Sequence, residues 1–177
     1  MIVRWFQFGA FCPLFRLHGH RGGAAAKANP PNQCGPTNGD NEVWNLAQMP
    51  EHYAAIQRVM MLREDLRDYV QQINNESVMF GTPMMRPVAL QFPADPVVKT
   101  NVTTTEAQFL LGPDWLIAPV TKENATSWPI YLPVLPEGDD AASWIYWWNG
   151  TSYKGGQHVV VNTTAIGDFP LFYRRPK

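Results

Sequence analysis

The chain has 177 residues, a length that suits one domain or an uneven pair. Its 14 basic and 15 acidic side chains leave a formal net charge of −1, so no sequence-wide cationic surface exists to collect phosphates, and we expect no nucleic acid partner. Cys12 and Cys34 are the two cysteines, which excludes a disulfide scaffold and a four-cysteine zinc site. Whether these two pair in an oxidising compartment stays open.

Residues 1–21 predict a short helix followed by a strand-like segment, because Trp5, Phe8 and Phe11 give a helical stripe before Pro13 stops it. The same region imitates a signal peptide, with an apolar run before three alanines at 24–26. No stretch reaches the ~20 apolar residues of a spanning helix, so we expect no membrane span. Residues 22–41 are rich in Gly, Ala, Pro and Asn and predict a long surface loop.

One amphipathic helix of roughly 25 residues is predicted from Pro50, which occupies a favoured first helical position. Its apolar positions are Ile56, Val59, Met60, Leu66, Tyr69, Val70 and Ile73. The Gly81-Thr82-Pro83 sequence ends this region. Residues 84–90 then predict an apolar strand or a short buried connection.

After residue 100 every pattern favours β structure. Short runs of aromatic and β-branched residues alternate with Gly, Pro, Asn and Asp, which predicts a sandwich or barrel-like β domain. The predicted strands are 115–120, 127–132, 144–148, 158–162 and 169–173. Asn149-Gly150 predicts a two-residue hairpin turn between strands at 144–148 and 151–153, because these residue types tolerate positive φ angles.

Two pairs of neighbouring carboxylates, Asp40 with Glu42 and Asp139 with Asp140, are candidates for catalysis. A glycosidase needs two carboxyls on opposite sides of the scissile bond, usually from different structural elements. Neighbours in one loop are more typical of solvated turn residues, so we expect neither pair to be catalytic.

A zinc site could be drawn from Cys12, His18, His20 and Cys34, but their spacing matches no standard pattern, and we expect no metal. The sequence also lacks a Gly-x-Ser-x-Gly motif and a phosphate-cradling glycine loop, and we expect no cofactor. Several tryptophans could instead be sugar-stacking platforms or core residues. The platform interpretation gives an alternative function, a freestanding carbohydrate-binding or structural β-sandwich protein that uses Trp115, Trp128, Trp144, Trp147 or Trp148.

Residues 4–19, RWFQFGAFCPLFRLHG, resemble a signature of glycoside hydrolase family 31, the family of α-glucosidases, α-xylosidases and related retaining α-glycosidases. Further segments are similar to the family in the same order. They are NEVW at 41–44, GTPMMRP at 81–87, QFLLGPDWLIAPV at 108–120, IYLP at 130–133, WNG at 148–150, YKGG at 153–156 and FPLF at 169–172.

The resemblance implies an α+β fragment: the last strand and helix of a (β/α)8 barrel, followed by an antiparallel β-sandwich domain. Residues 1–90 would be the incomplete C-terminal part of the catalytic TIM barrel, and residues 91–177 the proximal C-terminal β-sandwich domain. Because a whole barrel takes ~250 residues, we expect a truncated gene, a partial sequence or a degenerate copy. Residues 1–90 should then expose an apolar patch, and the apolar run near the start becomes a barrel helix instead of a signal peptide.

The resemblance implies a retaining exo-α-glycosidase that acts on terminal α-linked glucose or xylose-type residues, with a carbohydrate as its partner. Both catalytic aspartates of the family lie upstream of the matching segment, so we expect no catalytic residue here and no activity of the chain alone. One site position carries over: His18 corresponds to the histidine that hydrogen-bonds sugar hydroxyls at the end of the last barrel strand. The sugar, the linkage and the oligomeric state stay open.

Five Asn-x-Ser/Thr sequons are candidate N-glycosylation sites. They begin at Asn75, Asn101, Asn124, Asn149 and Asn162. One interpretation is passage through the secretory pathway; the other is that Asn and Thr are simply common in this chain.

Overall fold

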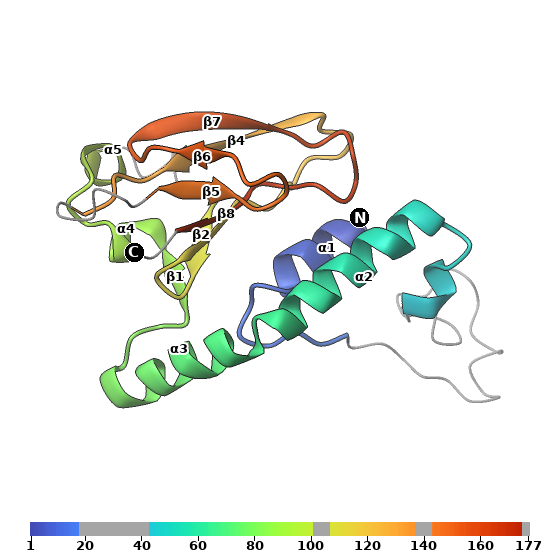
Figure 1. The fold of residues 1–177 in the computed structure, drawn as a ribbon, viewed down its shortest axis with the longest axis horizontal. Coiled ribbons are helices and arrows are strands. Elements are labelled where there is room, and N and C mark those ends of the chain that lie inside the picture. The colour runs from blue at the N-terminus through green and yellow to red at the C-terminus, as the bar shows by residue number, and fades with distance from the viewer. Residues whose placement is uncertain (18–42, 101–106, 137–142, 175–177) are drawn as a thin grey trace.

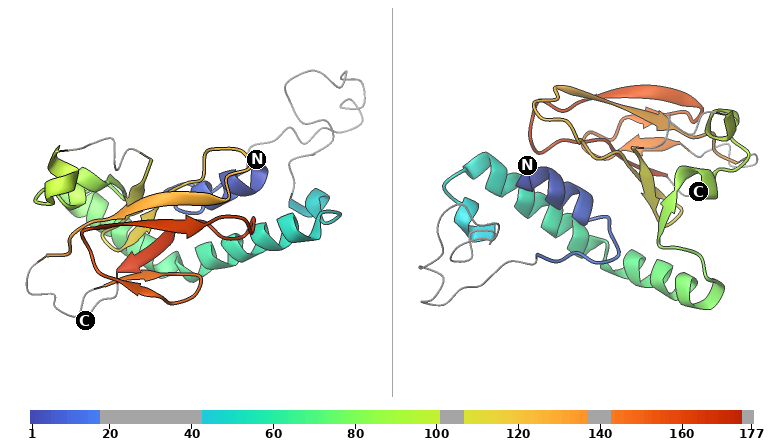
Figure 2. Two further views of the ribbon diagram at one scale, coloured as in Figure 1. Left: turned by 90° about the horizontal axis from the view of Figure 1, so that it is seen from above. Right: turned by 180° about the vertical axis from the view of Figure 1, so that it is seen from behind.

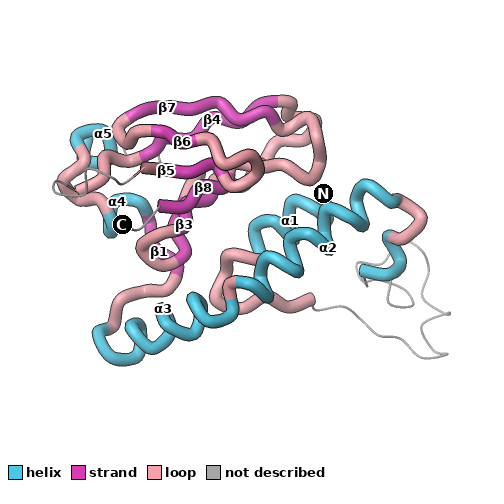
Figure 3. Tube along the Cα trace, viewed as in Figure 1, coloured by secondary structure: helices cyan, strands magenta, loops and turns pink. Residues whose placement is uncertain are grey.

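The structure is a computed structural model that describes residues 1–17, 43–100, 107–136 and 143–174 (Figure 1). A helical part comes first, with α1 (Ile2–Gly9), the 3-10 helix η3 (Val43–Leu46), α2 (Pro50–Asp65) and α3 (Arg67–Phe80). Two short helices, α4 (Val88–Gln91) and α5 (Pro96–Thr100), then precede most of the strands. Figure 3 shows the long helices and the strands separated into two parts of the molecule.

The single long helix predicted from Pro50 is wrong in one respect: it is two helices, α2 and α3, that meet at Leu66. At Leu66 the backbone has φ −85° and ψ 4°. Helical hydrogen bonding continues on both sides, with the Leu66 N–H donating to Leu62 O and the Val70 N–H donating to Leu66 O. The two helices therefore follow each other in nearly one line (Figure 2). The spacing of apolar residues along the sequence does not reveal that a helix is interrupted at a single residue.

The strands form two antiparallel layers, as the β-sandwich prediction requires (Figure 1). The larger sheet has the order β1-β2-β3-β8-β5-β6, and β4 pairs with β7 in the second sheet. The strands are β1 (Met85–Pro87), β2 (Phe109–Leu111), β3 (Trp115–Ile117), β4 (Ser127–Leu132), β5 (Trp144–Tyr146), β6 (Ser152–Tyr153), β7 (Gln157–Asn162) and β8 (Leu171–Arg174). Leu110, Leu116 and Phe172 stand in register across three neighbouring strands, and all three are fully buried.

The five predicted β runs each contain a strand, and β1 with α4 occupies the predicted connection at 84–90. Strand β6 lies within residues 151–153, the predicted second strand of the hairpin, whereas strand β2 was not predicted. The three residues of β2 are all buried, so they lack the alternation that marks a half-exposed strand. Leu14–Leu17, at the start of the predicted first strand, have no strand assignment, and the rest of that segment lies outside the described residues.

The predicted two-residue turn at Asn149-Gly150 is also wrong. Strand β5 ends at Tyr146, whose N–H donates to the Thr151 carbonyl at 2.8 Å, so the loop contains four residues. In this loop only Gly150 has a positive φ, at 73°. The two tryptophans before Asn149 belong to the loop and not to the strand, because their side chains pack against Phe169 and Tyr173 instead of pairing across the hairpin.

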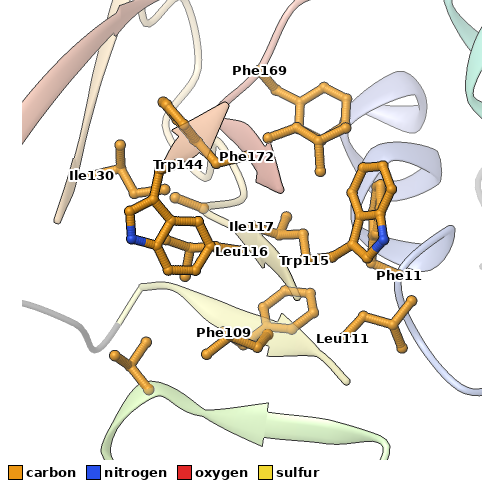
Figure 4. Close-up of a cluster of buried hydrophobic side chains, with 14 of the residues drawn as sticks. Phe11, Phe109, Leu111, Trp115, Leu116, Ile117, Ile130, Trp144, Phe169 and Phe172 are labelled. Carbon is orange, nitrogen blue, oxygen red and sulfur yellow. The ribbon is translucent and has the colours of Figure 1, made fainter. Parts of the chain in front are cut away.

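The core lies between the two sheets and extends to helix α1 (Figure 4). Phe11 is fully buried, with ring centroids 6.1 Å from Trp115 and 6.2 Å from Phe169. Trp144 is also fully buried and donates its indole N–H to the Pro133 carbonyl at 2.9 Å. The helical part and the sandwich therefore share one apolar cluster. Within the described ranges, no helix combines the length and apolar character needed to cross a membrane.

Candidate functional site

The predicted sugar-binding residue, His18, lies outside the described residues, but the segment that leads to it is defined. After α1, Ala10 and Phe11 are buried, and the chain turns at Cys12 and Pro13. Arg63 of α2 holds this turn: its guanidinium donates to Ala10 O at 2.9 Å and to Pro13 O at 3.1 Å. Burial lowers the pKa of Arg63. The α2 helix therefore sets the direction in which the chain approaches residue 18.

Cys12 sits inside this turn as a half-buried thiol. Burial raises its pKa, and the neighbouring Arg63 charge opposes that shift. Its sulfur lies 3.6 Å from the Phe8 carbonyl, as expected for a thiol that still carries its proton. The other members of the zinc set considered above, His18, His20 and Cys34, lie outside the described residues.

A second set of contacts joins α1 to the chain between β7 and β8. Arg4 donates to the carbonyls of Asp168 at 2.9 Å and Thr163 at 3.1 Å, and to Gln7 Oε1 at 2.9 Å. Gln7, which is 2% exposed, donates from Nε2 to Ile166 O at 2.8 Å. Two side chains one helical turn apart thus satisfy the carbonyls of an irregular segment that has no strand partner.

Arg58 of α2 holds the same segment from the other side. Its guanidinium donates to Gly167 O at 2.5 Å and to Asp168 Oδ1 at 2.7 Å. The guanidinium carbon also lies 3.9 Å from the centre of the Trp148 ring, a cation–π geometry. We call Arg4, Gln7 and Arg58 with residues 163–168 the helix–sandwich clasp.

A third link runs from α3 to the turn between β2 and β3. The Tyr69 hydroxyl donates to Leu111 O at 3.0 Å and accepts from the Asp114 N–H at 3.2 Å. Burial, followed by the nearby Asp114 charge, raises the pKa of Tyr69. Gly112 has φ 59°, and a Cβ at this position would overlap the Tyr69 hydroxyl. The close approach of α3 therefore requires glycine here.

An apolar groove of about 1160 Å³ opens along α1 and α2. We call it the α1–α2 groove. Large side chains that line it are strongly exposed: Trp5 is 63% exposed, Trp44 65% and Met61 62%. Leu14, beside the approach to residue 18, is 86% exposed. These exposed apolar side chains lie within residues 1–90, where an apolar patch is predicted, and the predicted size of that patch stays a prediction.

The candidate carboxylates Asp40, Glu42, Asp139 and Asp140 lie outside the described residues. Within the described part of the chain, no three His, Cys, Asp or Glu side chains gather closely enough to hold a metal ion. Asp114 pairs with Arg174 at 2.9 Å, and the buried Asp95 accepts hydrogen bonds from Val97, Val98, Tyr131 and Val134. Asp114 and Asp95 therefore stabilise the fold through these contacts.

The five tryptophans of the predicted sugar platform, at positions 115, 128, 144, 147 and 148, do not form an exposed row. Trp115, Trp128 and Trp144 are buried, as the core interpretation predicts. Trp148 is half-buried and donates to the Phe169 carbonyl at 2.8 Å, while Trp147 is 38% exposed. A freestanding sugar-binding platform needs several exposed rings side by side, and this arrangement disfavours it.

The supporting roles of the clasp residues and of Arg63 were not predicted. Arg4 and Gln7 lie three positions apart on a predicted helix, so a shared face could have been inferred. Their partners are backbone carbonyls about 160 residues away, and sequence carries no mark of such contacts.

Comparison with known proteins places this geometry in a family. Residues 1–73 match the glycosyl hydrolases family 31 TIM-barrel domain, and residues 81–176 match the glycosyl hydrolase family 31 C-terminal domain. The chain belongs to glycoside hydrolase family 31. It comprises the end of the family's TIM-barrel domain followed by its C-terminal domain. The finer division at residue 90 stays a prediction.

Individual relatives agree with this assignment. Alpha-xylosidase A of Aspergillus niger is 32% identical over 183 residues, which cover 98% of this chain and 23% of that protein. Sulfoquinovosidase of Escherichia coli is 32% identical over 98% of this chain and 21% of its own length. The structure of a family 31 alpha-xylosidase from a soil metagenome, complexed with xylose, has a TM-score of 0.78 and 31% identity; the match covers 99% of this chain and 24% of that one. The chain thus spans less than a quarter of the length of these relatives.

Proposed function

We propose that this chain supplies the C-terminal end of the catalytic barrel and the supporting β-sandwich of a retaining exo-α-glycosidase. Its substrates would be terminal α-linked glucose or xylose-type residues. Family membership and the α-xylosidases among its relatives support the reaction class. The remaining parts of the barrel, including both catalytic carboxylates, would come from sequence that these 177 residues do not contain.

The α1–α2 groove is the observation that carries this proposal. In a (β/α)8 barrel the helices form an outer ring, and each buries an apolar face against the strands and its neighbouring helices. Here α1, η3 and α2 present such a face, with Trp5, Trp44 and Met61 exposed along it. The proposed occupant of the groove is the rest of a family 31 barrel.

In the complete enzyme, one carboxylate would attack the anomeric carbon and form a covalent glycosyl-enzyme. The other would protonate the leaving oxygen and then take a proton from the attacking water. His18 would hold a sugar hydroxyl through one donor and one acceptor without adding charge beside the carboxylates. Arg63 would act as a positioning residue, because it fixes the turn that leads to His18.

Complementation tests the proposal. The purified chain alone is expected not to hydrolyse nitrophenyl α-xyloside, because loss of catalytic carboxylates costs many orders of magnitude in rate. It would then be co-expressed with Aspergillus niger alpha-xylosidase A from which the segment matching this chain has been deleted. A complex of the two pieces that hydrolyses the substrate is expected.

Two charged substitutions sharpen this test. Met61→Glu places a carboxylate in the α1–α2 groove and is expected to prevent the complex. Met79→Glu is the matched control, because Met79 is 71% exposed on α3 and does not line the groove. Turnover by the chain alone, failure of the two pieces to associate, or equal loss with both variants would contradict the proposal.

A further inference from the structure

Four of the five sequons lie within the described residues, and their asparagines, Asn75, Asn124, Asn149 and Asn162, are all exposed. The fifth, Asn101, lies outside the described residues. An exposed asparagine can carry a glycan without displacing the core, so exposure alone does not distinguish the four. Local structure distinguishes Asn149 and Asn162 from Asn75.

Asn149 and Asn162 share the same geometry with the residue two positions ahead. Asn149 Oδ1 accepts the Thr151 backbone N–H at 2.9 Å, and Asn162 Oδ1 accepts the Thr164 backbone N–H at 2.9 Å. A backbone N–H can only donate, so the oxygen of each carboxamide must face it. The side chain of each asparagine therefore bends toward the backbone of the threonine that completes its sequon. The nitrogen Nδ2, the atom that an N-glycan modifies, takes no part in either turn.

The Asn162 side chain is exposed on the face of β7 opposite to the inward-facing side chains of its neighbours. Strand side chains alternate between faces, and the neighbours Val161 and Thr163 are 4% and 2% exposed. Thr163 turns inward, where its hydroxyl donates to Ala125 O and its carbonyl accepts from Arg4. A glycan on Asn162 would therefore project from the opposite face and leave the clasp contacts intact.

Asn149 is the third residue of the loop between β5 and β6, beside the exposed Gly150 and Thr151. Its side chain supports this loop through Oδ1, so the loop does not compete for the nitrogen. Modification at Nδ2 leaves that hydrogen bond in place, because a substituted amide keeps its carbonyl oxygen.

Asn75 is the counterexample within the same chain. It lies in the interior of α3, and its sequon ends at Ser77. Side chains at i and i+2 of a helix do not face each other, so Asn75 cannot fold over Ser77 while the helix is intact. An enzyme that must recognise both side chains together would have to unwind the end of α3.

We propose that Asn149 and Asn162 are N-glycan acceptor sites of the folded protein and that Asn75 is not. The co-substrate is a lipid-pyrophosphate-linked oligosaccharide. The asparagine Nδ2 forms a bond to C1 of the first sugar, the bond from C1 to the pyrophosphate oxygen breaks, and the lipid pyrophosphate leaves with that electron pair. A base of the transferase takes the proton from Nδ2. This inference is independent of the proposed glycosidase function.

The experiment uses the folded, unglycosylated chain made in bacteria. A eukaryotic-type single-subunit oligosaccharyltransferase and its lipid-linked oligosaccharide are added, and occupied sites are mapped by mass spectrometry of peptides. Asn149 and Asn162 are expected to gain one glycan each, and Asn75 none. When the chain is denatured before the reaction, Asn75 is expected to become an acceptor as well.

Three variants give matched controls. Thr151→Ala and Thr164→Ala are each expected to abolish one glycan while keeping the asparagine, and Thr164→Ser is expected to retain modification of Asn162. Absence of glycan at both Asn149 and Asn162 in the folded chain overturns the proposal, whether or not the denatured chain is modified. Modification of only one overturns the assignment of the other. Equal modification of Asn75 before and after denaturation overturns the structural reason given for the difference.

Discussion

Arg4 and Asp168, separated by 164 positions in the sequence, meet where the Arg4 guanidinium donates to the Asp168 carbonyl at 2.9 Å. This contact lies at the centre of the helix–sandwich clasp, in which Gln7 and Arg58 hold neighbouring carbonyls. The clasp fixes α1 against the sandwich, and α1 leads within a few residues to the turn held by Arg63. Support for the predicted sugar-binding segment thus extends from the β-sandwich through two helices.

Arg4→Ala is expected to destabilise the fold measurably. The substitution removes a half-buried cation and leaves the carbonyls of Thr163 and Asp168 without this donor. Hydrogen bonds to charged groups contribute about 1.5–3 kcal/mol each, and neighbouring bonds of one side chain are not additive, so we expect a total loss of about 2–4 kcal/mol. Urea unfolding followed by tryptophan fluorescence measures this loss.

Arg67→Ala is the control for Arg4→Ala. The Arg67 side chain is 71% exposed and pairs with Glu64 on the surface of the helices, where an ion pair contributes about 0–1 kcal/mol. Equal destabilisation by both substitutions would contradict the role assigned to Arg4.

Gly112→Ala is expected to cost more than Gly81→Ala. Both glycines have positive φ, 59° and 70°, so alanine is strained at either position by about 1–2 kcal/mol. At Gly81 no atom lies within 4 Å of an added Cβ, whereas at Gly112 the Cβ would overlap the Tyr69 hydroxyl and crowd Ile73. Thermal unfolding of the two variants separates backbone strain from this overlap. A similar fall in Tm for both would show that α3 yields to the new methyl group.

Much of the fold could be predicted from residues 81–177, because aromatic and β-branched runs between turn residues mark strands directly. The pattern could not reveal β2, whose Phe109, Leu110 and Leu111 are all buried and show no alternation. It also misjudged the turn at Asn149, since the side chains of Trp147 and Trp148 prefer contacts with Tyr173 and Phe169 over strand pairing. Such preferences depend on residues far away in the sequence.

The candidate site was predictable only in part. His18 was identified through the resemblance to a family and not from any pattern of its own. An exposed apolar patch was expected from the size of a barrel, and the structure shows a groove along α1 and α2 in this region. The anchoring of the turn by Arg63 was invisible in the sequence because its partners are the backbone carbonyls of Ala10 and Pro13, which every residue type carries.

Stability is expected to fall at alkaline pH. Burial is the main cause that raises the pKa of Tyr146 to about 12, and burial also raises the pKa of Tyr69. In the unfolded chain tyrosine releases its proton near pH 10, so above that pH ionisation favours the unfolded state. The contribution of these two residues is fully present below pH 10 and is lost as the pH rises through the folded-state pKa values.

Urea unfolding between pH 8 and 11.5 measures this dependence. Tyr69→Phe removes one of the ionising groups, and the slope of unfolding free energy against pH above pH 10 is expected to become shallower. The variant also loses the hydrogen bonds to Leu111 and Asp114, so its stability at pH 8 should be lower. An unchanged slope would show that the Tyr69 hydroxyl ionises equally in both states.

His18→Ala in a complete enzyme is expected to lower kcat/KM while leaving Tm unchanged. Loss of a hydrogen bond in a pocket costs roughly 0.5–3 kcal/mol, depending on whether its partner is left unsatisfied. This range corresponds to about two-fold to 150-fold in kcat/KM. Part of the loss should appear in kcat, because contacts to sugar hydroxyls strengthen as the ring distorts toward the oxocarbenium-like transition state.

Arg63→Ala is the companion variant that separates binding from positioning. Loss of the Arg63 guanidinium leaves the carbonyls of Ala10 and Pro13 without this hydrogen-bond donor, so we expect both Tm and kcat/KM to fall. Arg63→Lys keeps the positive charge but not the arrangement of the two donors. A planar guanidinium can donate to both carbonyls in a fixed geometry, whereas an ammonium group is a compact charge on a flexible chain. We therefore expect Arg63→Lys to recover Tm more fully than kcat/KM. If His18→Ala lowered Tm as much as Arg63→Ala does, its kinetic loss would be explained by unfolding, and His18 would be a structural residue.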